Sequence, residues 1–176
     1  QANATSNVAV QPGAIASAWT YRSGLAPIGG VPVARLTAVT FAGGLVGSLL
    51  LVWTPARAFD VIVPWLLLAA TVAIALGRHA ADWVASRFRA GPRAVIAGQA
   101  LLGVYGGYFG GGVGMMLTAM WGVLTGAHPA ILAAPRTLML AVANTAATII
   151  FVVSGMVAWR YCIPMLVGSE IGRAHV

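Results

Sequence analysis

The sequence predicts an all-α protein, a polytopic transmembrane helical bundle with one glycine-broken helix. Of its 176 residues, 60% are hydrophobic and only 7% are charged, whereas a soluble domain carries about 25% charged residues. The uncharged runs are long and are separated by short segments that contain arginine. Because a helix needs about 20 apolar residues to cross a bilayer, these runs have the length of membrane spans. The low polar content excludes a soluble enzyme.

The basic residues fit a membrane partner better than a nucleic-acid partner. All ten are arginines, and the formal net charge is +7, which in a soluble protein would suggest nucleic acid. Here they stand singly at the ends of apolar runs, where they mark membrane edges. We therefore expect the lipid bilayer as partner and no nucleic acid. Whether the protein forms a homo-oligomer is left open.

Three spans are expected in residues 1–77. Residues 1–21 form the first, with Asn3, Asn7 and Gln11 near its start, and residues 36–53 form the second. Residues 58–77 form the third. Asp60 lies two residues inside this run, either as an interfacial carboxylate or as a proton-coupling group. Residues 78–93 are then a loop.

A glycine-rich segment interrupts the run of residues 94–127, which contains no charged residue. This run is too long for one plain helix and too short for two helices with a loop. Each glycine costs about 1 kcal/mol relative to alanine inside a helix, so we expect a broken helix that lines a site; packing through small residues is the alternative. The scattered Gly43, Gly44 and Gly47 fit that packing role. The segment's glycines are Gly103, Gly106, Gly107, Gly110, Gly111, Gly112 and Gly114.

The last spans are residues 137–159, headed by Arg136 and containing Asn144, and residues 161–169, which begin another helix. Residues 170–176 resemble the translation of a common sequencing adapter and are set aside from the functional argument. The chain also opens without Met. We therefore expect a sequence truncated at both ends.

If the spans alternate, arginine counts set the orientation, because cytoplasmic loops are enriched in Lys and Arg. The basic side, expected to be cytoplasmic, would carry Arg22, Arg35, Arg78, Arg87, Arg89, Arg93 and Arg160, and the other side Arg57 and Arg136. A re-entrant fold of residues 94–127 would upset this alternation. A faint repeat relates Asn3 and Trp19 to Asn144 and Trp159, and such duplication is common in secondary transporters.

The glycine segment, GVYGGYFGGGVG at residues 103–114, resembles the signature of the sulfite exporter TauE/SafE family of membrane permeases. The A-N-A-T-S stretch after Gln1 and the pattern Asn144, Gly155, Trp159 also resemble this family. The resemblance implies two similar halves, with residues 1–77 ending the first, residues 78–93 forming a cytoplasmic loop, and residues 94–169 starting the second. It also implies a multi-pass protein of the bacterial inner membrane.

The resemblance implies a permease that exports sulfite or a small organosulfur anion, and therefore a small anionic substrate as partner besides the bilayer. The alternative is a non-transporting membrane scaffold or assembly protein whose glycines only pack helices. An anion in a membrane needs backbone N–H groups, a helix N-terminus or a basic side chain. The alternative role of Asn144 is a hydrogen bond to another helix. The alternative role of Arg136 is to anchor the helix at the membrane–water interface. The candidate substrate-binding residues are Gly106, Gly107, Gly110, Gly111, Gly112, Gly114, Asn144, Arg136 and Asn3.

No catalytic set, metal-ligand cluster or cofactor motif is present in the sequence. We therefore expect no enzyme, no metal and no cofactor.

Overall fold

The prediction of an all-α fold is confirmed. The computed structural model describes the backbone of residues 2–85 and 91–174, and the side chains of residues 2–75 and 91–169. In this part of the chain the regular elements are helices, and an isolated bridge joins Ile28 to Val31. The helices are α1 (Ala2–Thr20), η1 (Tyr21–Gly24), α2 (Val33–Trp53), α3 (Ala56–Ala85), α4 (Pro92–Tyr108), α5 (Val113–Thr125), α6 (Pro129–Val153) and α7 (Trp159–Ala174).

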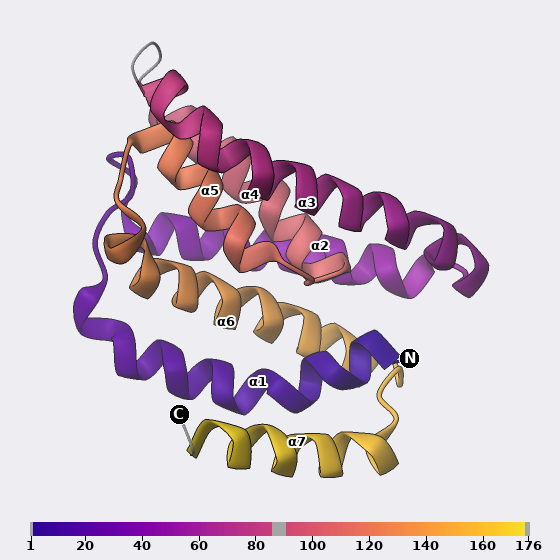
Figure 1. The fold of residues 1–176 in the computed structure, drawn as a ribbon. Helices are drawn as coiled ribbons and strands as arrows, with labels where there is room; N and C mark the ends of the chain where they lie inside the picture. The colour runs from indigo at the N-terminus through magenta and orange to yellow at the C-terminus, as the bar shows by residue number, and fades with distance from the viewer. Residues whose placement is uncertain (1, 86–90, 175–176) are drawn as a thin grey trace.

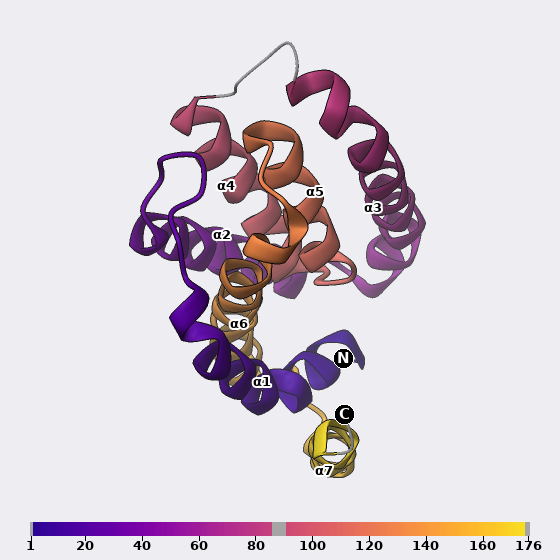
Figure 2. The ribbon, with the colours of Figure 1, turned by 60° about the vertical axis from the view of Figure 1, so that its left-hand side comes forward.

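The helices form a bundle in which successive elements reverse direction (Figure 1). At one end α1, α3 and α5 finish and α2, α4 and α6 begin. At the other end α2 and α6 finish, and α3 and α7 begin. Figure 2 shows α3 beside α5 on one flank and α7 beside α1 on the other. Within the described residues, three helical segments are long and apolar enough to cross a membrane: Val33–Trp53, Ala56–Ala75 and Pro129–Val153.

The glycine segment breaks the helix as predicted, and the run of residues 94–127 forms two short helices, α4 and α5. The chain turns back between α4 and α5 within residues 109–112, where Gly110 has φ of +77° and Gly112 has φ of +74°. Glycine adopts this left-handed conformation at little cost because it has no Cβ. These two glycines reverse the chain within one short turn, and both helices, of 17 and 13 residues, are shorter than a bilayer crossing of about 20 residues.

The α4–α5 hairpin is re-entrant within the bundle. Figure 1 shows its turn well short of the end at which α2 meets α3. Contacts agree, since a Cβ on Gly114 would lie 3.0 Å from Leu140 in the middle of α6. Non-helical backbone therefore lies among the helices, at partial depth.

The boundaries of two further elements differ from the prediction. The helix α3 continues to Ala85, into the expected loop of residues 78–93. The helix α6 begins at Pro129, where the imidazole of His128 accepts a hydrogen bond from Ala130 N (3.4 Å), and it ends at Val153. Arg136 is therefore inside α6 and does not head it, because proline at the first position and the His128 cap start the helix earlier.

Because of the hairpin, two arginines lie on other sides of the bundle than alternating spans would give. The hairpin returns the chain to its starting end, so α6 and Arg136 begin on the side of Arg22, Arg35 and Arg93. Arg57 and Arg160 lie at the other end, near the starts of α3 and α7. The strict alternation of spans is wrong in this respect, and Arg136 and Arg160 exchange sides. We call the end with Arg22, Arg35 and Arg93 the arginine-rich end.

Glycines bring α2 and α4 into backbone contact. A Cβ on Gly107 would lie 2.1 Å from the carbonyl oxygen of Gly44, and one on Gly47 would lie 2.0 Å from that of Val104. A Cβ on Gly43 would lie 3.0 Å from backbone atoms of Ala100 and Gly103. The prediction that Gly43, Gly44 and Gly47 serve close packing is confirmed.

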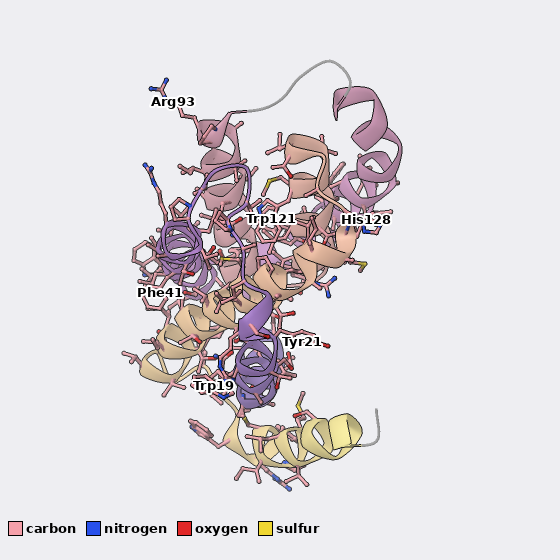
Figure 3. All side chains as sticks on the ribbon, turned by 90° about the vertical axis from the view of Figure 1, so that its left-hand side faces the viewer. Trp19, Tyr21, Phe41, Arg93, Trp121 and His128 are labelled. Atoms are coloured by element: carbon pink, nitrogen blue, oxygen red, sulfur yellow. The ribbon has the colours of Figure 1, made fainter. Side chains whose placement is uncertain are left out.

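A buried polar cluster ties the hairpin to the bundle. Gln99 is fully buried in α4; its Nε2 donates to Thr40 Oγ1 of α2 (2.6 Å) and its Oε1 accepts from Trp121 Nε1 of α5 (3.1 Å). Figure 3 shows Trp121 among the side chains inside the bundle. Both arms of the hairpin are thus bonded to each other and to α2.

Candidate functional site

The turn between α4 and α5 is the candidate site, and it is half-buried. Its first residues close α4, with Phe109 N and Gly110 N donating to the carbonyl of Tyr105 (2.9 and 3.3 Å). Its last residue, Gly112, is the N-cap of α5 and makes no side-chain cap bond because it has no side chain. No side chain of Gly112 therefore covers the backbone N–H groups at the start of α5.

Two aromatic residues hold the turn in place. The hydroxyl of Tyr105 donates to the carbonyl of Gly111 (2.8 Å), and the ring of Phe109 packs edge-on against the ring of Tyr105 at 6.0 Å. Sequence reasoning assigned no role to these two residues. Their place inside the glycine motif was the signal, since a tight turn needs something to pin it.

The turn offers free backbone donors. Within the described residues, the N–H groups of Gly111, Gly112 and Gly114 donate to no acceptor, whereas Val113 N reaches only Gly110 O at 3.5 Å. N–H groups in such a turn, at the positive end of a helix dipole, form a concave anion-binding arrangement. The turn therefore supplies backbone N–H groups that have no acceptor among the described residues.

The predicted glycines fall into two groups. Gly110, Gly111 and Gly112 form the turn, and Gly114 lies in the first turn of α5 against Leu140. Gly106 and Gly107 are buried in α4, where Gly107 meets Gly44, and a Cβ added to Gly106 would lie 3.5 Å from the Cβ of Ala143. These two glycines lie at helix contacts, away from the open side of the turn.

Asn3 is brought to the turn from the far end of the sequence. Its Nδ2 donates to the carbonyl of Tyr108, the last residue of α4 (3.4 Å). Asn3, Thr5, Ser6 and Tyr161 also line an open cavity of about 610 Å³ between α1 and α7. A mostly apolar hollow with a few polar side chains therefore adjoins the residue that contacts the start of the turn.

Asn144 lies at the level of the turn but already has a partner. Its Oδ1 accepts from Asn7 Nδ2 (3.2 Å), and Thr148 Oγ1 donates to Asn7 Oδ1 (3.2 Å). The neighbouring Ala143 touches Gly106. Asn144 thus bonds another helix, although its own Nδ2 donates to no acceptor in the described part of the chain.

The contact of Asn144 belongs to a polar seam between α1 and α6. Asn3, Asn7 and Gln11 follow one face of α1 at intervals of one turn. The buried Gln11 donates from Nε2 to Thr145 Oγ1 and to the carbonyl of Ala141, while its Oε1 has no partner. Of these polar residues the sequence put only Asn3 among the substrate-binding candidates, whereas the residue that bonds Asn144 is Asn7.

The two charged candidates lie apart from the turn. Arg136 is half-buried, one helical turn before Leu140, and its guanidinium makes no ion pair or hydrogen bond among the described residues. Asp60 is exposed in the second turn of α3. Arg136 is therefore close to the level of Gly114, and Asp60 lies near the end of the bundle.

Comparison with known proteins supplies a family. The family model described as sulfite exporter TauE/SafE matches residues 1–174. The "Probable membrane transporter protein YfcA" of Escherichia coli K12 is 30% identical to this chain over 136 residues, which cover 77% of this chain and 50% of that protein. The YfcA proteins of E. coli O6:H1 and O157:H7 match to the same extent. The chain spans about half the length of these curated relatives. No solved structure matches.

Proposed function

The chain belongs to the sulfite exporter TauE/SafE family, and from this membership we propose that it is part of a membrane transporter that exports a small anion, sulfite or an organosulfur anion. The observation that carries the proposal is the re-entrant turn, where the N–H groups of Gly111, Gly112 and Gly114 have no acceptor among the described residues. Broken helices of this kind hold substrate in many secondary transporters.

The turn suits an anion for three physical reasons. The glycines at 110–112 leave no Cβ between the backbone amides and a bound oxyanion. The N-terminus of α5 carries the positive end of the helix dipole. Removal from water costs an anion several kcal/mol unless new donors replace those of water, and the free amides provide them. In this mechanism the substrate oxygens accept hydrogen bonds from backbone N–H groups.

Polar side chains around the turn have supporting roles in the proposal. The free Nδ2 of Asn144 offers one more donor at the level of Gly106. Arg136 attracts anions along α6 toward Gly114, since its charge has no internal partner in the described residues. Asn3 holds the last carbonyl of α4 and so positions the start of the turn.

Export follows from the orientation proposed for the bundle. The arginine-rich end would face the cytoplasm by the enrichment of basic residues in cytoplasmic loops. The hairpin enters from this end, and the basic side chains there raise the local concentration of anions. Such a protein would reside in the bacterial inner membrane as a multi-pass protein.

The second candidate is a membrane scaffold or assembly protein that does not transport. The backbone contact of Gly107 with Gly44 favours it, because such contacts serve helix packing alone. In that case substitutions of these glycines would disturb oligomers or partner binding, with no dependence on any substrate.

The test is a flux assay with the full-length protein that carries this sequence, inserted in vesicles. Efflux of sulfite, sulfoacetate and chloride is measured with and without a pH gradient. We expect sulfite or sulfoacetate to move well above chloride. Absence of flux for every anion, from protein shown to be inserted, would favour the scaffold.

A matched pair of variants tests the turn itself. Gly112 and Gly155 both have left-handed φ, +74° and +66°, and Gly155 has no atom within 4 Å of an added Cβ. A side chain in this conformation costs about 1–2 kcal/mol at either position. We expect Gly112→Leu to abolish flux with insertion intact, and Gly155→Leu to retain it. Equal flux in both variants would exclude the turn as the substrate site.

A further inference from the structure

A basic groove lies at the arginine-rich end, away from the glycine turn. It has a volume of about 640 Å³ and is open to the surface. Arg35 from the first turn of α2 and Arg93 from the first turn of α4 both line it. Its other lining residues are Gly91, Pro92, Ala94 and Ile96. Figure 3 shows Arg93 extending outward from the start of α4.

No counter-charge accompanies these two arginines within the described side chains. Neither guanidinium makes an ion pair or a hydrogen bond there. Asp60, the one acid whose side chain the structure describes, lies at the opposite end of the bundle. The N-terminus of α4, with no side-chain cap at Gly91, adds its positive dipole end to the same groove. Arg35, Arg93 and the N-terminus of α4 thus place positive potential in one groove, with no acidic side chain beside them among those described.

A separate apolar groove lies farther along α4. It has a volume of about 290 Å³ and lies between α3, α4 and α5. On α4 it is lined by Gly98, Leu101 and Leu102, and Ala94 of the basic groove precedes Gly98 by one turn on the same face. Leu101 is 71% exposed. The remaining lining residues are Ala73, Met116, Ala119, Met120, Val123 and Leu124.

We propose that these two grooves together bind one anionic phospholipid, with its phosphate between Arg35 and Arg93 and one acyl chain along α4. A free anion would use the basic groove but would leave the apolar groove unfilled. From Ala94 to Leu101 the helix rises about 10 Å, which is about two thirds of one leaflet's hydrocarbon thickness of about 15 Å. Charge and apolar surface therefore occur in the order in which a lipid presents them.

The test measures binding of the first lipid to the purified full-length protein in detergent, by native mass spectrometry. Dioleoyl phosphatidylglycerol is compared with dioleoyl phosphatidylcholine. The double variant Arg35→Gln, Arg93→Gln removes both charges at exposed positions, and Arg57→Gln, Arg160→Gln is the matched control at the opposite end. Each arginine near an anionic surface contributes about fivefold in affinity. We expect about thirtyfold weaker phosphatidylglycerol binding in the first variant and little change in the control.

Two further arms distinguish a lipid from a free anion. Inorganic phosphate and glycerol phosphate, added at millimolar concentration, should fail to displace the lipid. Leu101→Gln should weaken binding of the dioleoyl lipid and leave that of dihexanoyl phosphatidylglycerol unchanged. Displacement by free phosphate, or equal loss in both arginine variants, would overturn the proposal. Failure of anion flux at the glycine turn would leave these lipid measurements unaffected.

Discussion

Single missing Cβ atoms control two different parts of this molecule. At Gly110 and Gly112 their absence permits left-handed backbone and exposes amides. At Gly44, Gly47 and Gly107 their absence lets two helix backbones touch. Adjacent glycines of one motif can therefore differ in what their substitution disturbs.

Gly106 and Gly107 provide a direct comparison. A Cβ on Gly107 would lie 2.1 Å from the backbone oxygen of Gly44, whereas one on Gly106 would meet Val113 Cγ2 at 3.4 Å, an ordinary contact. We expect Gly107→Ala to lower the free energy of unfolding by about 1–3 kcal/mol, the usual cost of overpacking. Gly106→Ala should lower it much less. Thermal unfolding in detergent measures both, and equal midpoints would contradict the backbone contact of α2 with α4.

Gln99 is the residue on which the buried polar cluster depends. The change Gln99→Leu leaves the indole N–H of Trp121 buried without its acceptor, which costs about 1–3 kcal/mol. Thr37 is the control, because its hydroxyl bonds only the carbonyl of Val33 in its own helix. We expect the unfolding midpoint to fall clearly for Gln99→Leu and little for Thr37→Val. A similar fall in both would show that the cluster has no special weight.

Among the helices, the α4–α5 hairpin is predicted only in part from the sequence. Glycine cost alone indicates a break in residues 94–127, and the break occurs there. Propensity does not reveal whether the chain continues or returns, because that depends on the φ values of Gly110 and Gly112 and on the bond from Tyr105 to Gly111. Similarly, charge counting ended a span at Arg136, whereas a half-buried arginine with its aliphatic stem against apolar neighbours is compatible with a helix interior.

The candidate site shows the same division. The motif predicted the turn glycines, and the polar residues Asn3 and Asn144 were predicted inside helices. Pairings across α1 and α6, such as that of Asn7 with Asn144, depend on rotation and register, which no single sequence specifies. The role of Tyr105 became visible only when its hydroxyl was seen to reach Gly111.

The contact between α1 and α6 has a measurable energy. Asn7 donates to Asn144, and hydrogen bonds between membrane helices average about 0.6 kcal/mol. A double-mutant cycle of Asn7→Ala with Asn144→Ala should therefore show coupling of about 0.5–1.5 kcal/mol in unfolding free energy. The control cycle pairs Asn144→Ala with Ser17→Ala, whose hydroxyl bonds Gly13 in its own helix. Zero coupling in the first cycle would contradict the seam.

For the whole molecule, the re-entrant hairpin decides which loops share a side. With the hairpin, the start of α6 returns to the side of η1, and the segment after Val153 lies on the other side. With alternating spans, these two segments would exchange sides. Arg136 and Arg160 lie near these two segments, so the arrangement of the spans changes which side each of these arginines is counted on when orientation is assigned.

Cysteine accessibility in oriented vesicles separates the two arrangements. In a Cys162→Ala background, Ser23→Cys, Ala130→Cys and Ser154→Cys each place a single thiol at an exposed position. We expect an impermeant maleimide to label Ser23→Cys and Ala130→Cys from the same side, and Ser154→Cys from the opposite side. Labelling of Ser154→Cys from the side of Ser23→Cys, with Ala130→Cys labelled from the opposite side, would restore strict alternation.

The polar seam has a consequence for movement. Asn3, Asn7 and Gln11 recur at one-turn intervals on α1, and their acceptors and donors on α6, at Ala141, Asn144, Thr145 and Thr148, recur at nearly the same interval. A slide of α1 by one turn, about 6 Å, would bring Asn3 to the partners of Asn7 and Asn7 to those of Gln11. Each amide can both donate and accept, so the number of bonds would be nearly conserved. The spacing of the seam therefore gives α1 a second register, one helical turn away, in which two of its amides would again face polar partners on α6.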